Sequence, residues 1–485
     1  MKILFINPPR HNGLPVIRED RCEIVNRYLV NPPYSLMLLA SSLRKQGHEV
    51  GIIDANCENL SYGAVGARIK TFAPQMTIFR FTPASSANDI KTADVVKSVC
   101  PDSLVVTLCW SLKWVAEDIL KRYKNIDVYV KGEYHYYGTI IKDLIKALNG
   151  KRSLEKVANI TFRKGSRIIS TARKAQEDPS ACGNIYEHPL PAYDLIPPLS
   201  RYYISPKYYR HTPFTIMYAS AGCPNKCIYC VVSKTKWKVR TLKSIKTEID
   251  HLKRTQGLRC IFFMDEFFTL DRKRVIGLCE HMIKNKMDIT WYASTRVDKV
   301  DAKMLALMRE AGCRALSFGI ESGSQKIVDN AKKGFNVEQA LKTIKMVKEA
   351  GILVHLSMII GLPGENQQTV DETIKFVKQA CPSMAQFNVA VPYPGTELYD
   401  LAQKKGWLKR NIDYSDLQHH TCLSRTLEMT TDEILKARMR AYRALYFSPR
   451  WIISQFTNFK DVSFTVKYYI KCMGMYFVNR MKNSH

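Results

Sequence analysis

The chain has 485 residues, of which 46% are hydrophobic and 10% aromatic, so it can form two or three domains with sizeable cores and is not a disordered polymer. Lysine and arginine number 73 and aspartate and glutamate 44, which gives a formal net charge of +29. This charge favours anionic partners such as nucleic acid, acidic lipid or a phosphorylated substrate, although a lysine-rich proteome would give the same sum.

The sequence has neither an apolar run long enough to cross a membrane nor the apolar core and cleavage site of a signal peptide. We therefore expect a cytoplasmic protein. Its fourteen cysteines are then expected to be mostly reduced and buried, and any tight group of them is expected to bind metal.

The first 150 residues alternate short apolar runs with segments of helical spacing. Strands are expected at 2–7, 49–54, 76–81, 104–108 and 127–130, and helices at 35–46, 88–99, 113–123 and 137–148. Short strands that alternate with helices predict an α/β domain with a doubly wound parallel sheet. Such sheets bind ligands at the carboxyl ends of their strands.

Residues 151–213 break this pattern. The runs 157–162 and 167–171 flank Lys164 and Gly165 and predict a hairpin, and a stretch rich in Pro and Tyr at 187–206 predicts a linker on a surface. We therefore place a domain boundary on each side of this region.

From residue 214 to about 400 the alternation resumes in longer units. Strands are expected at 214–220, 260–265, 289–295, 315–321, 353–360 and 384–391, and helices at 245–255, 272–284, 303–311, 337–350 and 369–380. Six strand–helix units predict a partial (βα)6 barrel. Chemistry in such barrels takes place at the carboxyl ends of the strands.

The carboxyl-terminal region, 401–485, is predicted to be helical and basic, with ten Lys or Arg against three Asp or Glu in residues 431–485. An amphipathic helix is expected at 429–445, and residues 451–481 mix aromatic with basic side chains. Two interpretations stay open: a cap packed on the barrel, or a helix on a membrane surface that presents a lipid-like substrate.

The most informative segment, residues 221–230, directly follows the first strand of the barrel. Cys223, Cys227 and Cys230 are four and three residues apart, so one loop can wrap them around a single cluster. Three thiolates on an iron–sulfur cube leave one iron without a protein ligand, and that iron can coordinate a substrate or cofactor. The alternatives are a zinc site that lacks one ligand and a chance arrangement.

With aromatic Tyr229 before the last cysteine, this pattern resembles the signature of the radical S-adenosylmethionine (SAM) superfamily. The resemblance implies a [4Fe–4S] cluster on Cys223, Cys227 and Cys230, whose unique iron chelates the amino and carboxyl groups of SAM, with Tyr229 near the adenine. It implies reductive cleavage of SAM to a 5′-deoxyadenosyl radical that abstracts hydrogen from an unactivated carbon. A one-electron donor such as a ferredoxin or flavodoxin is implied as partner.

Two later strand ends are similar to family segments that bind the methionyl part of SAM. Asp265 and Glu266 stand where the family contacts the methionyl amine. Arg296 ends the third barrel strand, and its guanidinium suits pairing with the methionyl carboxylate.

Two further strand ends are similar to segments that approach the nucleoside. Glu321 and Ser322 are implied to lie near the ribose or methionine. Gly361 and Gly364 are implied to allow close approach of the backbone. Each match alone is weak, because an acidic pair or a glycine-rich turn is more often structural, but the matches occur in order, each at a strand end.

The order of domains resembles the cobalamin-binding radical SAM enzymes, which include carbon and phosphorus methylases, hopanoid methylases and the anaerobic magnesium-protoporphyrin ester cyclase. Matching segments lie at 6–9, 36–43, 47–50, 53–56, 130–133 and 190–197, so the resemblance covers about residues 1–400. It implies cobalamin as a cofactor. Where the group usually has a Gly-Gly pair and a His, this chain has Leu108, Cys109, Trp110 and Ser111, whose bulk is expected to crowd the corrin.

The predicted organisation is a cobalamin-binding-like domain at 1–150, a hairpin and linker at 151–213, a radical SAM barrel at 214–400 and a basic helical region at 401–485. The predicted reaction is cobalamin-dependent methyl transfer to an unactivated carbon of a small or lipid-like substrate. No general acid or base is identified.

The sequence leaves three alternatives. The first is radical oxidation, cyclisation or carbon–carbon coupling of a hydrophobic substrate without methyl transfer. The second is a tRNA methylthiotransferase, which would use the basic charge but carries a second cysteine triplet and a small RNA-binding barrel, so nucleic acid is not the expected partner. The third is a non-enzymatic electron-transfer or cluster-storage protein. The basic tail adds possible peripheral contact with a membrane to the cytoplasmic location.

Overall fold

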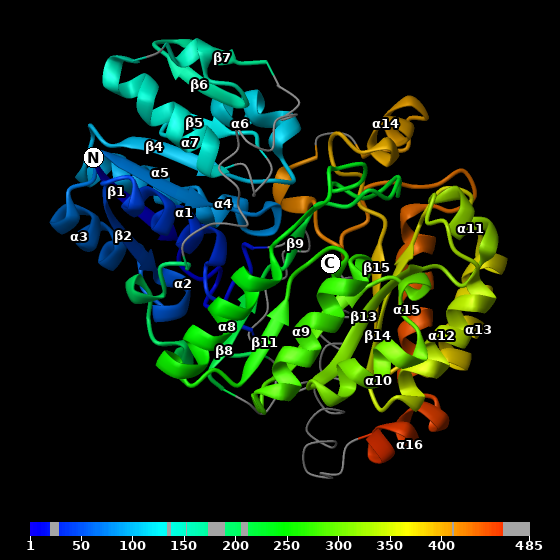
Figure 1. Cartoon of the computed structure of the whole chain (residues 1–485). Coiled ribbons are helices and arrows are strands. Elements are labelled where there is room, and N and C mark those ends of the chain that lie inside the picture. The colour runs from blue at the N-terminus through cyan, green and yellow to red at the C-terminus, as the bar shows by residue number, and fades with distance from the viewer. Residues whose placement is uncertain are drawn as a thin grey trace.

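The computed structural model describes residues 1–19, 29–132, 137–151, 153–172, 190–204, 212–409 and 412–458. Two α/β domains lie side by side, each built on its own sheet (Figure 1). The predicted tail beyond residue 458, the last residue of the matching segment 130–133, and the ends of the predicted linker at 187–189 and 205–206 lie outside the described residues.

The amino-terminal sheet has seven strands in the order β2-β1-β3-β4-β5-β6-β7. The parallel strands are β1 (Lys2–Asn7), β2 (Glu49–Asp54), β3 (Met76–Arg80), β4 (Leu104–Leu108) and β5 (Val128–Val130). The chain runs from β1 outward to β2 and then returns to place β3 on the other side of β1, so the expected doubly wound topology is confirmed.

Helices cover both faces of this sheet, because side chains along each strand alternate between two cores. In β1, Ile3 and Phe5 pack into one core with α1 and α7, whereas Leu4 and Ile6 pack into the other with α3, α5 and α6. The helices are α1 (Tyr34–Lys45), α2 (Ala55–Glu58), α3 (Tyr62–Phe72), α4 (Ser86–Asp89), α5 (Lys91–Val99), α6 (Ala116–Arg122) and α7 (Tyr137–Lys146). The single helix expected at 88–99 is divided at Ile90 into α4 and α5.

The predicted hairpin belongs to this sheet. Its strands β6 (Ile160–Lys164) and β7 (Arg167–Ser170) continue from the edge of β5 as antiparallel strands. Ile160 and Phe162 are buried in the core beneath α1 and α7. The sheet therefore extends past residue 150, because the hairpin covers an edge of β5 that would otherwise present unpaired backbone groups.

The second domain is an open barrel of six parallel strands in the order β15-β14-β13-β12-β11-β8, as expected. The strands are β8 (Phe214–Met217), β11 (Cys260–Phe263), β12 (Thr290–Thr295), β13 (Cys313–Glu321), β14 (Leu353–Ile360) and β15 (Met384–Val389). The helices are α8 (Leu242–Gln256), α9 (Arg272–Lys284), α10 (Ala302–Glu310), α11 (Gln325–Asn330), α12 (Val337–Glu349), α13 (Gln367–Ala380) and α14 (Glu397–Lys404). A short pair, β9 (Ser220–Ala221) and β10 (Lys238–Val239), lies between β8 and α8.

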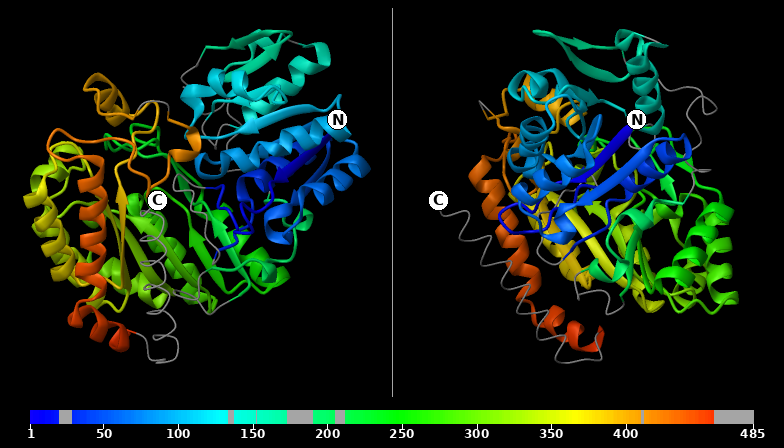
Figure 2. Two further views of the ribbon diagram at one scale, coloured as in Figure 1. Left: turned by 180° about the vertical axis from the view of Figure 1, so that it is seen from behind. Right: turned by 90° about the vertical axis from the view of Figure 1, so that its left-hand side faces the viewer.

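The open edge of the barrel at β15 is covered by α15 (Thr431–Tyr446), which runs beside it (Figure 2). The Tyr446 hydroxyl accepts from the N–H of Ala385 (3.1 Å) and donates to its carbonyl (2.7 Å). The Tyr442 hydroxyl accepts from the N–H of Phe387, and Arg438 donates to the carbonyl of the same residue. Side chains of a helix therefore satisfy backbone groups that a further strand would otherwise pair.

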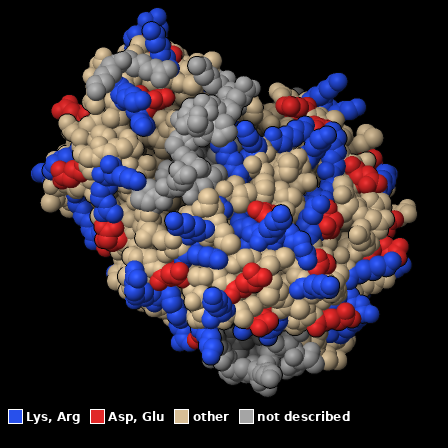
Figure 3. All heavy atoms as spheres, viewed as in Figure 1, with Lys and Arg blue, Asp and Glu red and all other residues tan. Residues whose placement is uncertain are grey.

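The last described helix, α16 (Pro449–Asn458), is anchored by Trp451, whose indole N–H donates to the Pro382 carbonyl at 2.9 Å. Residues 431–455 thus pack on the barrel, as the first interpretation of the carboxyl-terminal region expected. Among the described residues, none of the helices combines the length and apolarity needed to span a bilayer. Lys and Arg side chains gather on the face shown in Figure 3, over the region where Figure 1 draws the segment between β9 and β10.

Candidate active site

The three cysteines of the predicted cluster lie on the loop between β9 and β10, at the carboxyl end of β8. The loop is held by its own backbone: the N–H of Thr235 donates to the carbonyl of Cys223 (3.0 Å), and that of Cys230 to the carbonyl of Cys227 (3.3 Å). None of the three forms a disulfide with a described residue; Cys227 is buried, and Cys223 and Cys230 are partly exposed. The loop therefore presents thiols at the barrel mouth without drawing them into the core.

Gly222 shows why glycine precedes the first cysteine. Its φ is +82°, and a Cβ placed there would lie 2.4 Å from the carbonyl oxygen of Lys236. The two ends of the loop approach each other so closely at this point that no side chain fits.

The donor set fits an iron–sulfur cube. Among the described residues, the loop cysteines included, no three His, Cys, Asp or Glu side chains form a group that could hold a single metal ion. Three thiols on one loop are the ligands that a [4Fe–4S] cluster with one open iron requires. Cys223, Cys227 and Cys230 are the residues that would hold it.

Tyr229, between the second and third cysteines, belongs to a partly buried polar triad. Its hydroxyl donates to Glu321 Oε1 (2.8 Å), and Lys333 Nζ lies 2.8 Å from the same carboxylate oxygen and 3.1 Å from the hydroxyl. Burial and the neighbouring Glu321 raise the pKa of Tyr229. Burial by itself lowers the pKa of Lys333, but Glu321 reverses this effect and the pKa is raised overall. The triad thus joins the cysteine loop to the end of β13.

Glu321 is placed in this triad by an irregular strand end. The register between β13 and β14 shifts between Gly319 and Glu321, and Glu321 has a φ of +70°. A left-handed conformation is unfavourable for a residue with a side chain and is characteristic of functional sites. Lys333 was not found from the sequence, because it lies between α11 and α12 and follows no strand end.

Arg296 lies at the end of β12, as expected. Its guanidinium contacts Asp298 (2.9 Å) and donates to the carbonyls of Lys333 (2.8 Å) and Gly334 (3.2 Å). Arg296 therefore positions the segment that carries Lys333. Its pairing with a methionyl carboxylate stays a prediction.

Asp265 is fully buried at the end of β11 and joins that strand to the start of the cysteine loop. Its carboxylate accepts from the N–H of Ala219 (2.7 Å) and the hydroxyl of Ser220 (2.6 Å), and Arg274 lies 3.6 Å away. Burial raises the pKa of Asp265. Glu266 lies next to it and is partly buried. Contact of either residue with a methionyl amine stays a prediction.

The remaining expected residues shape the ends of β13 and β14. The hydroxyl of Ser322 is buried against Thr373 of α13 (2.9 Å), which makes it a link between strand and helix. Gly361 and Gly364 have φ values of +94° and +85°, and a Cβ on Gly364 would lie 2.5 Å from Asn330 Nδ2. Both glycines are therefore required by the turn itself. Their approach to a nucleoside, and that of Ser322 to ribose or methionine, stay predictions.

The same turn contains Glu365, a buried carboxylate that the sequence interpretation did not select. Its Oε2 accepts from the backbone N–H groups of Gly361 and Leu362. Its Oε1 is buried and has no hydrogen-bond partner among the described residues. Burial raises the pKa of Glu365 to about 8, against which the two backbone hydrogen bonds act only partly.

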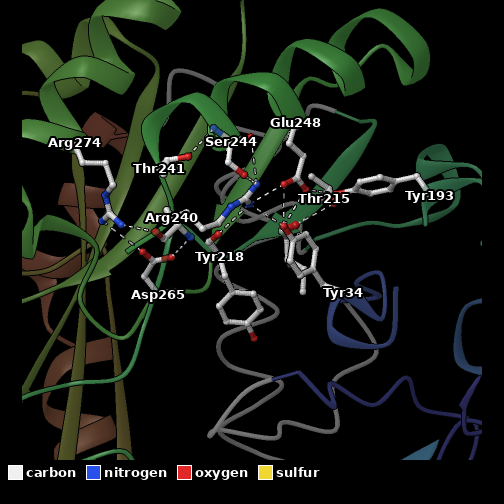
Figure 4. A network of polar contacts seen from close by, with 12 residues as sticks. Tyr34, Tyr193, Thr215, Tyr218, Arg240, Thr241, Ser244, Glu248, Asp265 and Arg274 are labelled. Carbon is white, nitrogen blue, oxygen red and sulfur yellow. Dashed lines mark hydrogen bonds and ion pairs between the residues drawn. The ribbon is translucent and has the colours of Figure 1, made fainter. Parts of the chain in front are cut away.

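A polar network joins the two domains beneath the cysteine loop (Figure 4). Glu248 of α8 accepts from the hydroxyls of Tyr34 (2.9 Å) and Tyr193 (2.8 Å) and pairs with Arg240 (2.7 Å). Tyr34 begins α1, Tyr193 lies in the linker, and Arg240 directly follows β10. This set is called the interdomain network below, and it ties the amino-terminal domain to the segment that carries the cysteines.

The edge of the amino-terminal sheet is less crowded than the sequence suggested. Leu108 and Cys109 are buried in the two opposite cores of the sheet, so their side chains occupy the interior and the expected crowding by them was wrong. Trp110 stays at the edge, with Lys113 Nζ 3.4 Å from its ring centroid. The Trp110 indole N–H and the Thr82 hydroxyl, at neighbouring strand ends, are buried without hydrogen-bond partners among the described residues. Two such orphaned groups fit an edge that receives a ligand.

Known proteins share this combination of domain and cysteine loop. The radical SAM superfamily model matches residues 217–377. The chain is 28% identical over 473 residues to an uncharacterized methyltransferase of Pyrococcus horikoshii, with 96% of each chain covered. It is 27% identical to the anaerobic magnesium-protoporphyrin IX monomethyl ester cyclase of Rubrivivax gelatinosus, covering 98% of this chain and 82% of the cyclase. The barrel of this chain thus matches the radical SAM superfamily over residues 217–377, and the whole chain is similar to these two relatives.

The likeness extends to the amino-terminal domain of the chain. The cobalamin-dependent radical SAM enzyme OxsB, solved with aqua-cobalamin and SAM bound, matches with a TM-score of 0.76 at 15% identity, covering 99% of this chain and 72% of that one. At that identity the likeness shows a shared fold. Together with the full-length similarity to the cyclase, it shows that the likeness covers both domains of the chain.

Proposed function

We propose that the chain is a cobalamin-dependent radical SAM methyltransferase that modifies an unactivated carbon of a small or lipid-like substrate. The observation that carries the proposal is the three-thiol loop at the mouth of an open (βα)6 barrel, directly tied to a doubly wound domain of the cobalamin-binding type. The similarity to a methyltransferase over 96% of both chains supports the reaction class.

Residues in different parts of the chain have different roles in this proposal. Cys223, Cys227 and Cys230 would hold a [4Fe–4S] cluster, which supplies the electron that cleaves SAM to methionine and a 5′-deoxyadenosyl radical. The triad of Tyr229, Glu321 and Lys333 fixes the wall beside that loop and provides donors and acceptors for a polar cofactor.

The amino-terminal domain would hold cobalamin at its carboxyl edge, where it supplies the methyl group. Trp110 and Thr82 are the residues with unused hydrogen-bonding groups at that edge. Because the described cysteines form no disulfide with one another, we expect the protein to work in the reducing cytoplasm.

The test is anaerobic purification and reconstitution with iron, sulfide and cobalamin, followed by reduction with dithionite in the presence of SAM. We expect about four irons per chain, a bound corrinoid spectrum and release of 5′-deoxyadenosine. With a methyl acceptor, S-adenosylhomocysteine should accumulate as the cobalamin is methylated again. Release of 5′-deoxyadenosine without corrinoid or methylated product would favour oxidation, cyclisation or coupling instead.

Cys230→Ala and Cys100→Ala form a matched pair, because both thiols are partly exposed. Cys230→Ala should abolish release of 5′-deoxyadenosine and reduce iron loading, whereas Cys100→Ala should retain both. If both variants keep iron and nucleoside release, the cysteine loop is not the cluster site and the proposal fails.

A further inference from the structure

The interior face of the barrel sheet lies opposite its helices. Outward side chains of β13 and β14, such as Leu316, Phe318 and Leu356, are buried in the core that the helices cover (Figure 1). Because side chains alternate along a strand, the residues between them point into the barrel. Barrel interiors are usually filled by bulky Val, Ile and Leu side chains. Departures from that rule therefore mark interior positions that are not built for packing alone.

Two rows of aligned residues cross this interior face. The lower row consists of Ser294 in β12, Ser317 in β13, His355 in β14 and Met384 in β15. The upper row consists of Gly319 in β13, Ser357 in β14 and Gln386 in β15. Neither row contains Val, Ile or Leu, and neither contains Asp, Glu, Lys or Arg. We call the polar residues of these two rows the polar lining.

The polar lining is accessible and has unused hydrogen-bonding groups. Ser294, Ser317 and Ser357 are partly exposed, although each lies in a strand with neighbours on both sides. The amide of Asn388, which borders the lining, reaches Ser357 Oγ at 3.5 Å. Among the described residues, the side chains of Ser294, Ser317 and Gln386 have no hydrogen-bond partner. These groups are therefore available to a ligand.

The lining lies below the barrel mouth, where the cysteine loop and the triad are. Ser317 comes four residues before Glu321 on the same strand, which is about 13 Å along a strand. Arg296 and Glu321, which are predicted to bind SAM, are charged and lie at the strand ends. A molecule held against the lining would therefore extend from the mouth into the barrel, beneath the charged groups that suit SAM.

The chemistry of the polar lining limits what it can bind. Hydroxyl, amide and imidazole groups both donate and accept hydrogen bonds. An alkyl chain would displace water from these groups and leave them unpaired, which costs free energy. A phosphate, carboxylate or ammonium group would be buried there with no opposite charge in either row, which costs more. An uncharged molecule with its own hydroxyl or amide groups avoids both costs.

We propose that the methyl acceptor is an uncharged, water-soluble molecule with several hydroxyl or amide groups, which bind the polar lining while the reacting carbon stays at the barrel mouth. The proposal rests on the proposed function and narrows its substrate class, because it excludes both a lipid and a phosphorylated compound. Ser294, Ser317, Ser357 and Gln386 are the residues expected to determine this specificity.

The first experiment asks which class of molecule accepts the methyl group. The reconstituted holoprotein receives dithionite and SAM with a tritium-labelled methyl group. The probe is a small-molecule extract of cells of the source organism, separated into neutral aqueous, anionic, cationic and chloroform-soluble fractions. Each fraction is tested separately as the acceptor, and the labelled product is resolved from SAM by chromatography. We expect label to be transferred to the neutral aqueous fraction.

The second experiment changes the lining itself. Gln386→Met keeps the length of the side chain and removes the amide. We expect it to transfer label to the neutral fraction about three- to ten-fold more slowly at limiting acceptor, which is the effect of losing one neutral hydrogen bond. More 5′-deoxyadenosine should then be released per labelled product. Ser317→Ala should act in the same direction, and it provides a second test if Gln386→Met fails to load iron.

The matched control is Gln339→Met, which makes the same exchange at an exposed position of α12. It should transfer label at the rate of the unsubstituted protein. Equal slowing in the control would show that the lining is not the cause and would overturn the proposal.

Three other outcomes would overturn it while leaving the proposed function intact. One is label that appears only with the chloroform-soluble fraction or with a charged fraction. Another is a Gln386→Met variant that transfers label as fast as the unsubstituted protein or faster. The third is a loss of SAM affinity as large as the loss of transfer, which would assign the lining to SAM. Absence of 5′-deoxyadenosine from the unsubstituted protein would instead refute the proposed function.

Discussion

The interdomain network makes a quantitative prediction about how the domains are held together. In Tyr34→Phe the ring keeps its packing against Tyr218, whose centroid is 5.7 Å away, and only the hydroxyl is lost. That hydroxyl donates to Glu248 (2.9 Å) and accepts from Arg240 (3.0 Å). A hydrogen bond to a charged group contributes about 1.5–3 kcal/mol. Because Glu248 keeps Tyr193 and Arg240 as partners, we expect a loss of about 2 kcal/mol.

Removing the carboxylate should cost more than removing a hydroxyl. Glu248→Ala leaves Arg240 buried without its ion-pair partner, and breaking a buried pair in this way costs about 3–5 kcal/mol. We therefore expect Glu248→Ala to destabilise the chain clearly more than Tyr34→Phe does. Tyr193→Phe should resemble Tyr34→Phe.

The assay is urea unfolding followed by two probes, because a chain of two domains need not unfold in one transition. The network variants should lower the midpoint of the transition that separates the domains. Tyr129→Phe is the control, since its hydroxyl donates to the Cys109 carbonyl within one domain and should cost about 1 kcal/mol without affecting domain contact. The network variants should also change the outcome of the reaction. When the two domains are held together less tightly, more 5′-deoxyadenosine should be released per molecule of methylated product.

Two results would refute this reasoning. One is a Glu248→Ala variant no less stable than Tyr34→Phe, which would mean that Arg240 is not dependent on the carboxylate. The other is strict additivity of Tyr34→Phe and Arg240→Met in a double-mutant cycle, because residues in contact should show a coupling energy of about 0.5 kcal/mol or more.

Three further predictions concern the barrel mouth. Burial raises the pKa of Glu365 to about 8 from 4.5. Between these pH values the folded chain therefore holds a proton that the unfolded chain releases. The free energy of unfolding should fall by about 5 kcal/mol from pH 4.5 to 8 as a result. Glu365→Gln should remove this fall. Urea unfolding should therefore show a gain in stability over the unsubstituted protein that is larger at pH 8.5 than at pH 6, by about 2–3 kcal/mol. An equal difference at both pH values would contradict this prediction. Lys333→Met should lower the free energy of unfolding by about 3 kcal/mol, because it leaves Glu321 buried without its cation. Lys333→Arg keeps the charge and should retain most of the stability. Equal losses of stability in both variants would show that the charge at this position is not the cause. Gly222→Ala should impair iron loading of the reconstituted protein, since the added methyl would meet the Lys236 carbonyl; normal loading would show that the loop tolerates another path.

The sequence alone predicted the features that depend on residues close to one another along the chain. The alternation of apolar runs and helical spacing predicted both sheets, because each strand or helix buries a face set by its own periodicity. The spacing of Cys223, Cys227 and Cys230 predicted one loop with three thiols. Gly361 and Gly364 were selected for close approach of the backbone to a nucleoside, which stays a prediction, whereas their positive φ values show that the turn itself requires glycine.

The tertiary structure determined the contacts between residues that are far apart along the chain. Tyr34 and Glu248 are 214 positions apart, and Lys333 and Tyr229 are 104 apart. No local pattern encodes such pairs, because their meeting depends on how complete strands and helices pack. The same reason explains why Asp265 emerged as a link between strand ends, why the predicted hairpin joined the first sheet, and why α15 covers the open edge of β15. The sequence determined the chemical groups and the elements that carry them, and packing determined which of those groups face one another.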